Sequence, residues 1–229
     1  MRKQSTFVIE SRAHRIGRLH AVTDFHYQQR FGADRLAELA IRGGADTIQF
    51  RQKKGPIRHK IAEAERVARI CRETGTTLII DDHIDVCLAV GADGVHLGQE
   101  DFPVDLARHV LGDDYIIGAT ATTLDQARRA WNEGADYIGF GPVFPTDSKD
   151  RLAAVKGTEA LASVCEALGI PVIAIAGMTV ERIEQVMRAG AYGVAVLSAI
   201  SASRDPLTAA SELKAELSRW IPATTAAAS

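Results

Sequence analysis

Several features that mark specialised classes of protein are scarce in this sequence. The three cysteines, Cys71, Cys87 and Cys165, are far apart and set in apolar helical patterns, which argues against a disulfide framework or a zinc site and favours a reducing compartment. No apolar run reaches the length of a membrane span, and the polar, basic start over residues 1–15 lacks the apolar core of a signal peptide. We therefore expect a cytoplasmic protein with no membrane partner.

An excess of charge of one sign is also lacking. The 229 residues carry a formal net charge of −2, which suggests no bulk attraction to nucleic acid or to an anionic membrane. With 46% hydrophobic and 24% charged residues, the composition is that of an ordinary globular protein of one large domain or two small ones. The residues do not determine the oligomeric state, and they are compatible with a homodimer.

What the chain does have is a regular alternation of short apolar runs and amphipathic helical patterns. Eight such strand–helix units fit between residues 16 and 220, which predicts an α/β TIM (β/α)8 barrel as a single domain. A doubly wound open sheet is the alternative, but eight regular units with no leftover edge strand favour closure. Residues 1–15 are predicted to be an N-terminal extension, and residues 221–229 a disordered tail.

A tripeptide repeat supports this count. Gly-Ala-Asp occurs at residues 44–46, 91–93 and 134–136, and Gly-Ala-Tyr at residues 190–192 is a fourth copy. Each copy lies between a predicted helix and an even-numbered predicted strand, so the repeat spans two strand–helix units. A barrel of this kind places its active site at the C-terminal ends of its strands, so the residues just after each strand are the candidates for function.

The stretch from Leu78 to Asp101 carries the strongest signal. Two predicted strands, residues 77–80 and 94–98, are each followed by carboxylates, among them Asp82 and Asp101. Parallel strands joined by a helix have their C-terminal ends on one side, so these two aspartates should lie near each other. Magnesium takes such ligands, usually with substrate phosphates and waters. The alternative is that each aspartate merely caps the next helix.

Basic residues follow the second predicted strand. Alternation puts Gln49, Arg51 and Lys53 on one face, and arginine together with lysine suits a phosphate or diphosphate. A solvated basic turn is the alternative.

Other loops carry groups that can bind an anion. A long loop over residues 142–149 offers two hydroxyls and a lysine, and loops of this length are usually functional. The loops after the seventh and eighth strands, with Gly177 and residues 198–200, correspond to a recurring phosphate site of the fold. Two anion-binding halves suggest two phosphorylated substrates, one of them a diphosphate that needs magnesium.

Five of these runs resemble the thiamine-phosphate synthase family. The resemblance rests on residues 49–53, 81–82, 94–101, 141–149 and 196–200, and the run Gly-Val-His-Leu-Gly-Gln-Glu-Asp at 94–101 is specific. It covers about residues 19 to 217. It implies a transferase that joins hydroxymethylpyrimidine diphosphate to a thiazole phosphate, with release of diphosphate. It also implies Mg2+ as the cofactor, with Asp82 and Asp101 as its ligands.

The resemblance also implies roles for individual residues. Catalytic roles fall on Arg51, Lys53, Thr120 and Lys149. Substrate contacts fall on Gln49, Phe50, Arg51, Gln52, Lys53, Asp81, Thr120, Thr146, Asp147, Ser148, Lys149, Gly177, Leu197 and Ser198. Positive charge would balance the departing diphosphate, and the electron-rich pyrimidine would carry the cation that the thiazole nitrogen attacks. No general base or covalent nucleophile is needed.

Three positions depart from the family pattern. The family usually has Asn where this chain has Asp81, Ser at Thr120 and Thr at Ser148, and only the first change adds a charge. The histidines His20, His83 and His96 have no neighbouring nucleophile in the sequence. We expect them to pack or cap rather than to catalyse.

Two other functions remain open. The thiazole tautomerase branch shares this fold and carries a catalytic histidine at the position of Thr122. A non-catalytic barrel that binds thiamine precursors is the second alternative. Thr122 and the retention of both metal aspartates favour the synthase.

Overall fold

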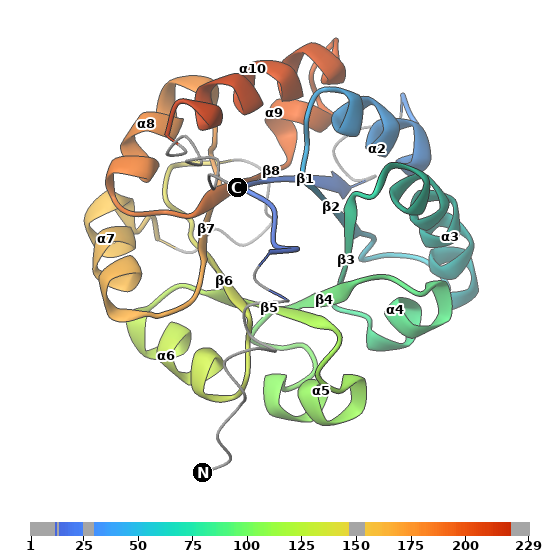
Figure 1. Cartoon of the computed structure of the whole chain (residues 1–229), viewed down its shortest axis with the longest axis horizontal. Coiled ribbons are helices and arrows are strands. Elements are labelled where there is room, and N and C mark those ends of the chain that lie inside the picture. Colours follow the sequence, from blue (N-terminus) through green and yellow to red (C-terminus); the bar gives the residue numbers. More distant parts are fainter. Residues whose placement is uncertain (1–11, 13, 25–29, 147–153, 221–229) are drawn as a thin grey trace, which may run out of the picture.

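The computed structural model describes residues 12, 14–24, 30–146 and 154–220. Parallel strands close into a barrel in the order β1 to β8, with β8 pairing with β1, and the helices surround the barrel (Figure 1). The predicted (β/α)8 fold is thus confirmed, and the open doubly wound sheet is wrong, because a closed barrel has no sheet edge. The tail 221–229 and most of the extension 1–15 lie outside the described residues, so that division of the chain stays a prediction.

The elements alternate along the chain. The strands are β1 (Leu19–Asp24), β2 (Thr47–Arg51), β3 (Thr77–Asp81), β4 (Gly94–Leu97), β5 (Ile116–Ala121), β6 (Tyr137–Phe140), β7 (Val172–Ile175) and β8 (Gly193–Val196). The helices are α2 (Ala33–Arg42), α3 (Ile57–Thr74), α4 (Ile84–Val90), α5 (Val104–Leu111), α6 (Leu124–Asn132), α7 (Gly157–Ala167), α8 (Val180–Arg188), α9 (Ser198–Ser201) and α10 (Pro206–Ser218). Among the described residues, no helix is both long and apolar enough to cross a membrane.

The strands separate two apolar layers. The larger layer fills the space between strands and helices, where alternate strand residues such as Phe50 and Ile80 meet the buried faces of the helices. The smaller layer fills the inside of the barrel and contains Ile79, Ile116 and Tyr137. Because alternate residues of a strand point to opposite faces, the side chain of each strand residue belongs to one layer only.

The tripeptide repeat has a structural reason. The carboxylates of Asp46, Asp93 and Asp136 accept hydrogen bonds from amides at the start of the preceding odd strands, those of Leu19, Leu78 and Ile117, with N–O distances of 3.0, 2.8 and 2.8 Å. The fourth copy has Tyr192 instead, whose N–H donates to the carbonyl of Val172 and whose hydroxyl donates to the carbonyl of Ile16. The repeat therefore satisfies strand amides at the N-terminal face of the barrel, where such groups serve stability.

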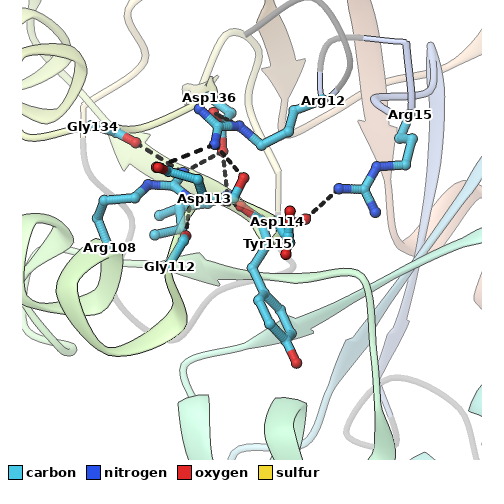
Figure 2. Close-up of polar contacts among 10 residues, drawn as sticks. Arg12, Arg15, Arg108, Gly112, Asp113, Asp114, Tyr115, Gly134 and Asp136 are labelled. Atoms are coloured by element: carbon cyan, nitrogen blue, oxygen red, sulfur yellow. Dashed lines mark hydrogen bonds and ion pairs between the residues drawn. The ribbon is translucent and has the colours of Figure 1, made fainter. Parts of the chain in front are cut away.

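Part of the N-terminal segment is attached to this same face. Figure 2 shows Arg12 and Arg108 converging on Asp136, with the Arg12 Nε 2.9 Å and the Arg108 Nη2 2.5 Å from its carboxylate oxygens. Arg12 is buried and also donates to the carbonyl of Asp113, while Arg15 donates to the carbonyl of Asp114. Residues 12 and 15 thus bind the N-terminal face of the barrel, opposite the strand ends that carry the candidate site.

Candidate active site

The C-terminal ends of β1 to β3 bring three charged residues into contact. The register of the sheet pairs Asp24 with Arg51, and the Arg51 guanidinium forms an ion pair with the Asp24 carboxylate. The Arg51 Nε also lies 3.8 Å from the Asp81 carboxylate. Both aspartates are buried, so this arginine balances two carboxylates that would otherwise be costly to remove from water.

Asp81 is held in a polar position inside the barrel. The side-chain amide of Gln49 donates to its Oδ1 at 2.5 Å. Burial, and then the nearby Asp82 carboxylate, raise the pKa of Asp81 to about 7, while Gln49, Arg51 and Lys53 act in the opposite direction. Near neutral pH this side chain is therefore present in both its neutral and its ionised form.

Asp82 occupies a left-handed backbone conformation. Its φ is +65°, which is uncommon for a residue other than glycine but is tolerated by aspartate. Its main-chain N–H donates to the His96 carbonyl at 2.9 Å, and Lys53 Nζ lies 2.7 Å from its Oδ2. A residue held in this conformation by neighbouring contacts is a common feature of functional sites.

The second predicted metal ligand lies directly beside the first. The carboxyl groups of Asp82 and Asp101 are within hydrogen-bonding reach of each other, and the Gly98 N–H donates to Asp101 Oδ2 at 2.7 Å. Burial and then Asp82 raise the pKa of Asp101. The capping alternative is wrong for both aspartates, because the N-caps of α4 and α5 are His83 and Pro103, without side-chain cap bonds.

The pair fits a magnesium ion. Two adjacent, partly buried carboxylates repel each other unless a proton or a cation lies between them, and Lys53 reaches only one of them. Within the described ranges there is no group of three or more His, Cys, Asp or Glu residues that could hold a metal. A cation here would take two carboxylates from the protein and its remaining oxygens from substrate and water, as magnesium usually does.

A chain of hydrogen bonds inside the barrel reaches Thr120. The His96 ring lies 2.8 Å from Thr120 Oγ1 through Nε2 and 3.0 Å from the Tyr137 hydroxyl through Nδ1. Space for these rings comes from glycine: a Cβ at Gly139 would lie 2.9 Å from His96 Cε1, and one at Gly118 would overlap Tyr137. His96 therefore packs, as expected, and it also orients the hydroxyl predicted to touch substrate.

His20 has a packing role as well. It is buried, its Nε2 lies 2.9 Å from the Gly17 carbonyl, and burial lowers its pKa to about 4. It is therefore neutral under ordinary conditions.

The loops after β6, β7 and β8 form the other half of the C-terminal face. Gly177 has φ +66°, and a Cβ there would lie 2.5 Å from the Pro145 carbonyl oxygen, so only glycine fits. Arg182 Nη1 donates to the Gly177 carbonyl at 2.5 Å and stacks on the Phe144 ring, which fastens this turn to the loop after β6. Thr146 is partly buried, and Ser198 is exposed at the start of α9.

Some predicted residues lie away from these groups or outside the described chain. The Phe50 side chain is buried in the layer between strands and helices, because it alternates with Gln49 and Arg51, so only its main chain could contact substrate. Gln52 is partly buried, and its Nε2 lies 3.5 Å from His59 Nδ1. Asp147, Ser148 and Lys149 are outside the described residues, and Leu197 is partly buried ahead of α9.

The sequence interpretation missed three residues that the structure brings to the site. Asp24 is the last residue of β1, a position similar to those of Asp82 and Asp101 just after β3 and β4. Its place at a strand end could therefore have identified it as a site residue. Tyr137 looked like an ordinary strand residue, and Lys60 looked like one more charge in an amphipathic helix. Neither carries a local pattern that distinguishes it.

Comparison with known proteins points to one family. A family model described as thiamine monophosphate synthase matches residues 19–200. Thiamine-phosphate synthase from Salinibacter ruber is 57% identical over 88% of this chain and 89% of its own, and the one from Methanocella arvoryzae is 43% identical over 88% and 95%. The solved structure of thiamine phosphate pyrophosphorylase from Pyrococcus furiosus superposes with a TM-score of 0.82, at 36% identity, and covers 89% of this chain and 96% of that one.

Proposed function

Because the chain belongs to the thiamine monophosphate synthase family, we propose that it joins hydroxymethylpyrimidine diphosphate to a thiazole phosphate, giving thiamine phosphate and diphosphate. The observation that carries this proposal is the meeting of Asp82 and Asp101 beside Lys53, next to the Arg51 ion pairs. Carboxylates for a cation and basic groups for phosphate thus lie together where a barrel enzyme binds its substrates.

Magnesium is the cofactor that we assign to this pair. Asp82 and Asp101 would hold it, and when bound it supplies positive charge to the phosphate oxygens of the leaving diphosphate. Arg51 and Lys53 add further charge from the second strand, and we assign Lys149 to the same task from the loop after β6. Stabilising the charge that develops on a leaving group is the main contribution such residues make to rate.

The reaction needs no proton transfer at the reacting atoms. The bond between the pyrimidine methylene carbon and the diphosphate oxygen breaks, and the diphosphate leaves with the electron pair. The pyrimidine ring carries the resulting cation, and the thiazole nitrogen forms the new carbon–nitrogen bond with its own lone pair. The imidazole nearest the site, His96, contacts the hydroxyls of Thr120 and Tyr137, and the proposed step requires neither hydroxyl to act as a nucleophile.

The remaining contacts divide between the two substrates. We assign Gln49, Asp81 and Thr120 to the pyrimidine, since these polar groups lie inside the barrel at its C-terminal end. We assign the other predicted contacts in the same way. The contacts near the diphosphate are the Phe50 main chain, Gln52, Lys53 and Asp147. The contacts near the thiazole phosphate are Thr146, Ser148, Gly177, Leu197 and Ser198.

The test is release of diphosphate by the purified protein with both substrates, with and without magnesium. Release that needs both substrates and the metal supports the proposal. Binding of both substrates without release would favour the non-catalytic barrel. Aromatisation of a thiazole carboxylate phosphate tautomer would favour the tautomerase. Thr122 argues against that activity, because its hydroxyl and N–H both donate to Gln126 Oε1 and a threonine cannot titrate near neutral pH.

Asp81→Asn is expected to keep synthase activity within about tenfold of wild type, a change of roughly 1.4 kcal/mol in the barrier. A neutral Asp81 resembles the family's usual Asn in charge, and both side chains can accept a hydrogen bond from the pyrimidine amine. Steady-state kinetics with the pyrimidine diphosphate varied would measure this. A hundredfold loss in the Asn variant would show that the carboxylate itself is required.

The same variant should change the pH dependence of stability. Because the pKa of Asp81 is raised to about 7 in the folded protein, above roughly 3.9 in the unfolded chain, its ionisation lowers stability most above pH 7 and has no effect below pH 4. In EDTA, Asp81→Asn should therefore raise the Tm at pH 8, with the gain fading between pH 7 and pH 4. Asp85→Asn, at an exposed neighbour, is the control, and a gain that did not depend on pH would contradict the argument.

We also propose a homodimer, formed through α5. Leu106 and Val110 are 49 and 53% exposed and four residues apart on α5, and Phe102, just before this helix, is 42% exposed, so two antiparallel copies of α5 would place Leu106 near the symmetry axis. Light scattering should report a dimer, and Leu106→Glu should convert this dimer to a monomer. Val155→Glu, at a 49% exposed residue away from α5, should leave the dimer intact. A monomeric wild type would refute the dimer.

The cell compartment is a further proposal. The three cysteines are free thiols, and Cys71 and Cys87 are buried. Free cysteines of this kind suit a reducing compartment, and we place the enzyme in the cytoplasm without a nucleic-acid partner.

A further inference from the structure

Lys60 occupies an environment that is unfavourable for a lysine. It lies in the first turn of α3, and it is only 6% exposed. Burial of an ammonium group is costly, and a positive charge near a helix N-terminus is opposed by the helix dipole. The first turn of α3 contains no acidic residue that would offset this. Specific contacts must therefore hold the charge in place.

The contacts of Lys60 join two loops. Its Nζ donates to the main-chain carbonyl of Lys53 at 3.1 Å, in the loop after β2, and lies 2.7 Å from His83 Nε2, in the loop after β3. An ammonium group can only donate, so in this contact Nε2 is the acceptor and Nδ1 is left to donate. That Nδ1 lies 3.7 Å from Asp85 Oδ1, which suits a proton there.

These are the two loops that carry the facing charges of the site. Lys53 places its ammonium 2.7 Å from the Asp82 carboxylate, and His83 follows Asp82 directly. The contacts form a closed ring, from the Lys53 side chain to Asp82, along the chain to His83, across to Lys60 and back to the Lys53 carbonyl. Lys53 is half exposed, and an exposed ion pair has little power to fix its own geometry. Asp82, with its left-handed φ, also depends on its surroundings.

We propose that Lys60 is a positioning residue for diphosphate binding, acting through Lys53 and Asp82 and resting on the proposed synthase function. It ties the loop after β2 to the loop after β3 so that the Lys53 ammonium and the Asp82 carboxylate stay in register. Lys60 itself touches no substrate, because its Nζ is enclosed by the Lys53 main chain and His83. Among the described residues, those of the thiazole half of the site, on β6 to β8, share none of these contacts.

The test compares Lys60→Met with Lys60→Arg and with Lys54→Met, which removes a lysine from the exposed part of the same loop. Calorimetry with inorganic diphosphate and magnesium gives a binding constant that does not depend on turnover. We expect Lys60→Met to weaken this binding about tenfold and to raise the KM for the pyrimidine diphosphate similarly, with the KM for the thiazole phosphate within about twofold. Lys60→Arg should recover most of the loss, since a guanidinium can donate to both acceptors, and Lys54→Met should resemble wild type.

The outcomes are distinguishable. Unchanged diphosphate binding in Lys60→Met, or equal loss for both substrates, would overturn the role of Lys60. A wild type that binds magnesium diphosphate but releases none from the substrates would refute the synthase function, while the calorimetric comparison still tests Lys60. If Lys60→Met does not fold, His83→Ala removes the other end of the same contact and carries the same expectations.

Discussion

Replacing Asp101 by alanine is expected to lower kcat/KM for synthase turnover by at least about a thousandfold, roughly 4 kcal/mol of barrier. Asp101 and Asp82 are the two carboxylates proposed to hold magnesium, and one carboxylate alone is a much weaker site for a cation that is strongly hydrated. Without the cation, the charge on the departing diphosphate is balanced only by Arg51 and the nearby lysines.

The same substitution should leave the barrel folded. Asp101 lies after β4 and is partly exposed, and apart from Asp82 its carboxylate accepts only the Gly98 amide bond among the contacts described. Removing it also relieves the repulsion with Asp82. Turnover measured across a range of magnesium concentrations, together with a thermal melt, would test both statements. Glu100→Ala, at the exposed preceding residue, is the control. Wild-type rates in Asp101→Ala, with magnesium still required, would contradict the assignment of Asp101 as a magnesium ligand.

Replacing Arg51 by methionine should damage stability and activity together. Breaking a buried ion pair by removing one partner typically costs about 3–5 kcal/mol, because the other charge stays buried and unpaired. Here the Asp24 carboxylate would lose its ion pair and Asp81 its nearest guanidinium, and both side chains are less than 10% exposed. Activity should fall about a hundredfold or more, since a charge proposed to stabilise the leaving diphosphate is lost.

Denaturant melts and kinetics on a short series would separate the two effects. Arg51→Lys keeps the charge but not the planar fork, so it should lie between wild type and Arg51→Met. Asp24→Asn combined with Arg51→Met should be less destabilised than the sum of the single changes, because the buried carboxylate that lost the Arg51 ion pair is then neutral. Arg58→Met, at an exposed residue of α3, is the control. An Arg51→Met protein as stable as wild type would contradict the role given to this ion pair.

Much of the fold was accessible from local patterns. The two strands predicted at residues 77–80 and 94–98 agree with β3 and β4 to within one residue at each end. The tripeptide repeat indicated doubled units correctly, although its cause, carboxylates that bind amides at the start of odd strands, is visible only in three dimensions. The predicted neighbourhood of Asp82 and Asp101 is confirmed, because parallel topology alone brings successive strand ends together.

The sequence by itself determined the alternation of strands and helices and which residues follow each strand, because both are properties of short segments. Only the tertiary structure decided which of those residues meet. The pairing of Arg51 with Asp24 depends on the register of β1 against β2, and the pKa of Asp81 depends on its burial. The contact of Lys60 with His83 joins residues 23 positions apart through the packing of α3 beside the loop after β3. Such contacts leave no periodic trace, since each depends on where the closed barrel places distant strand ends.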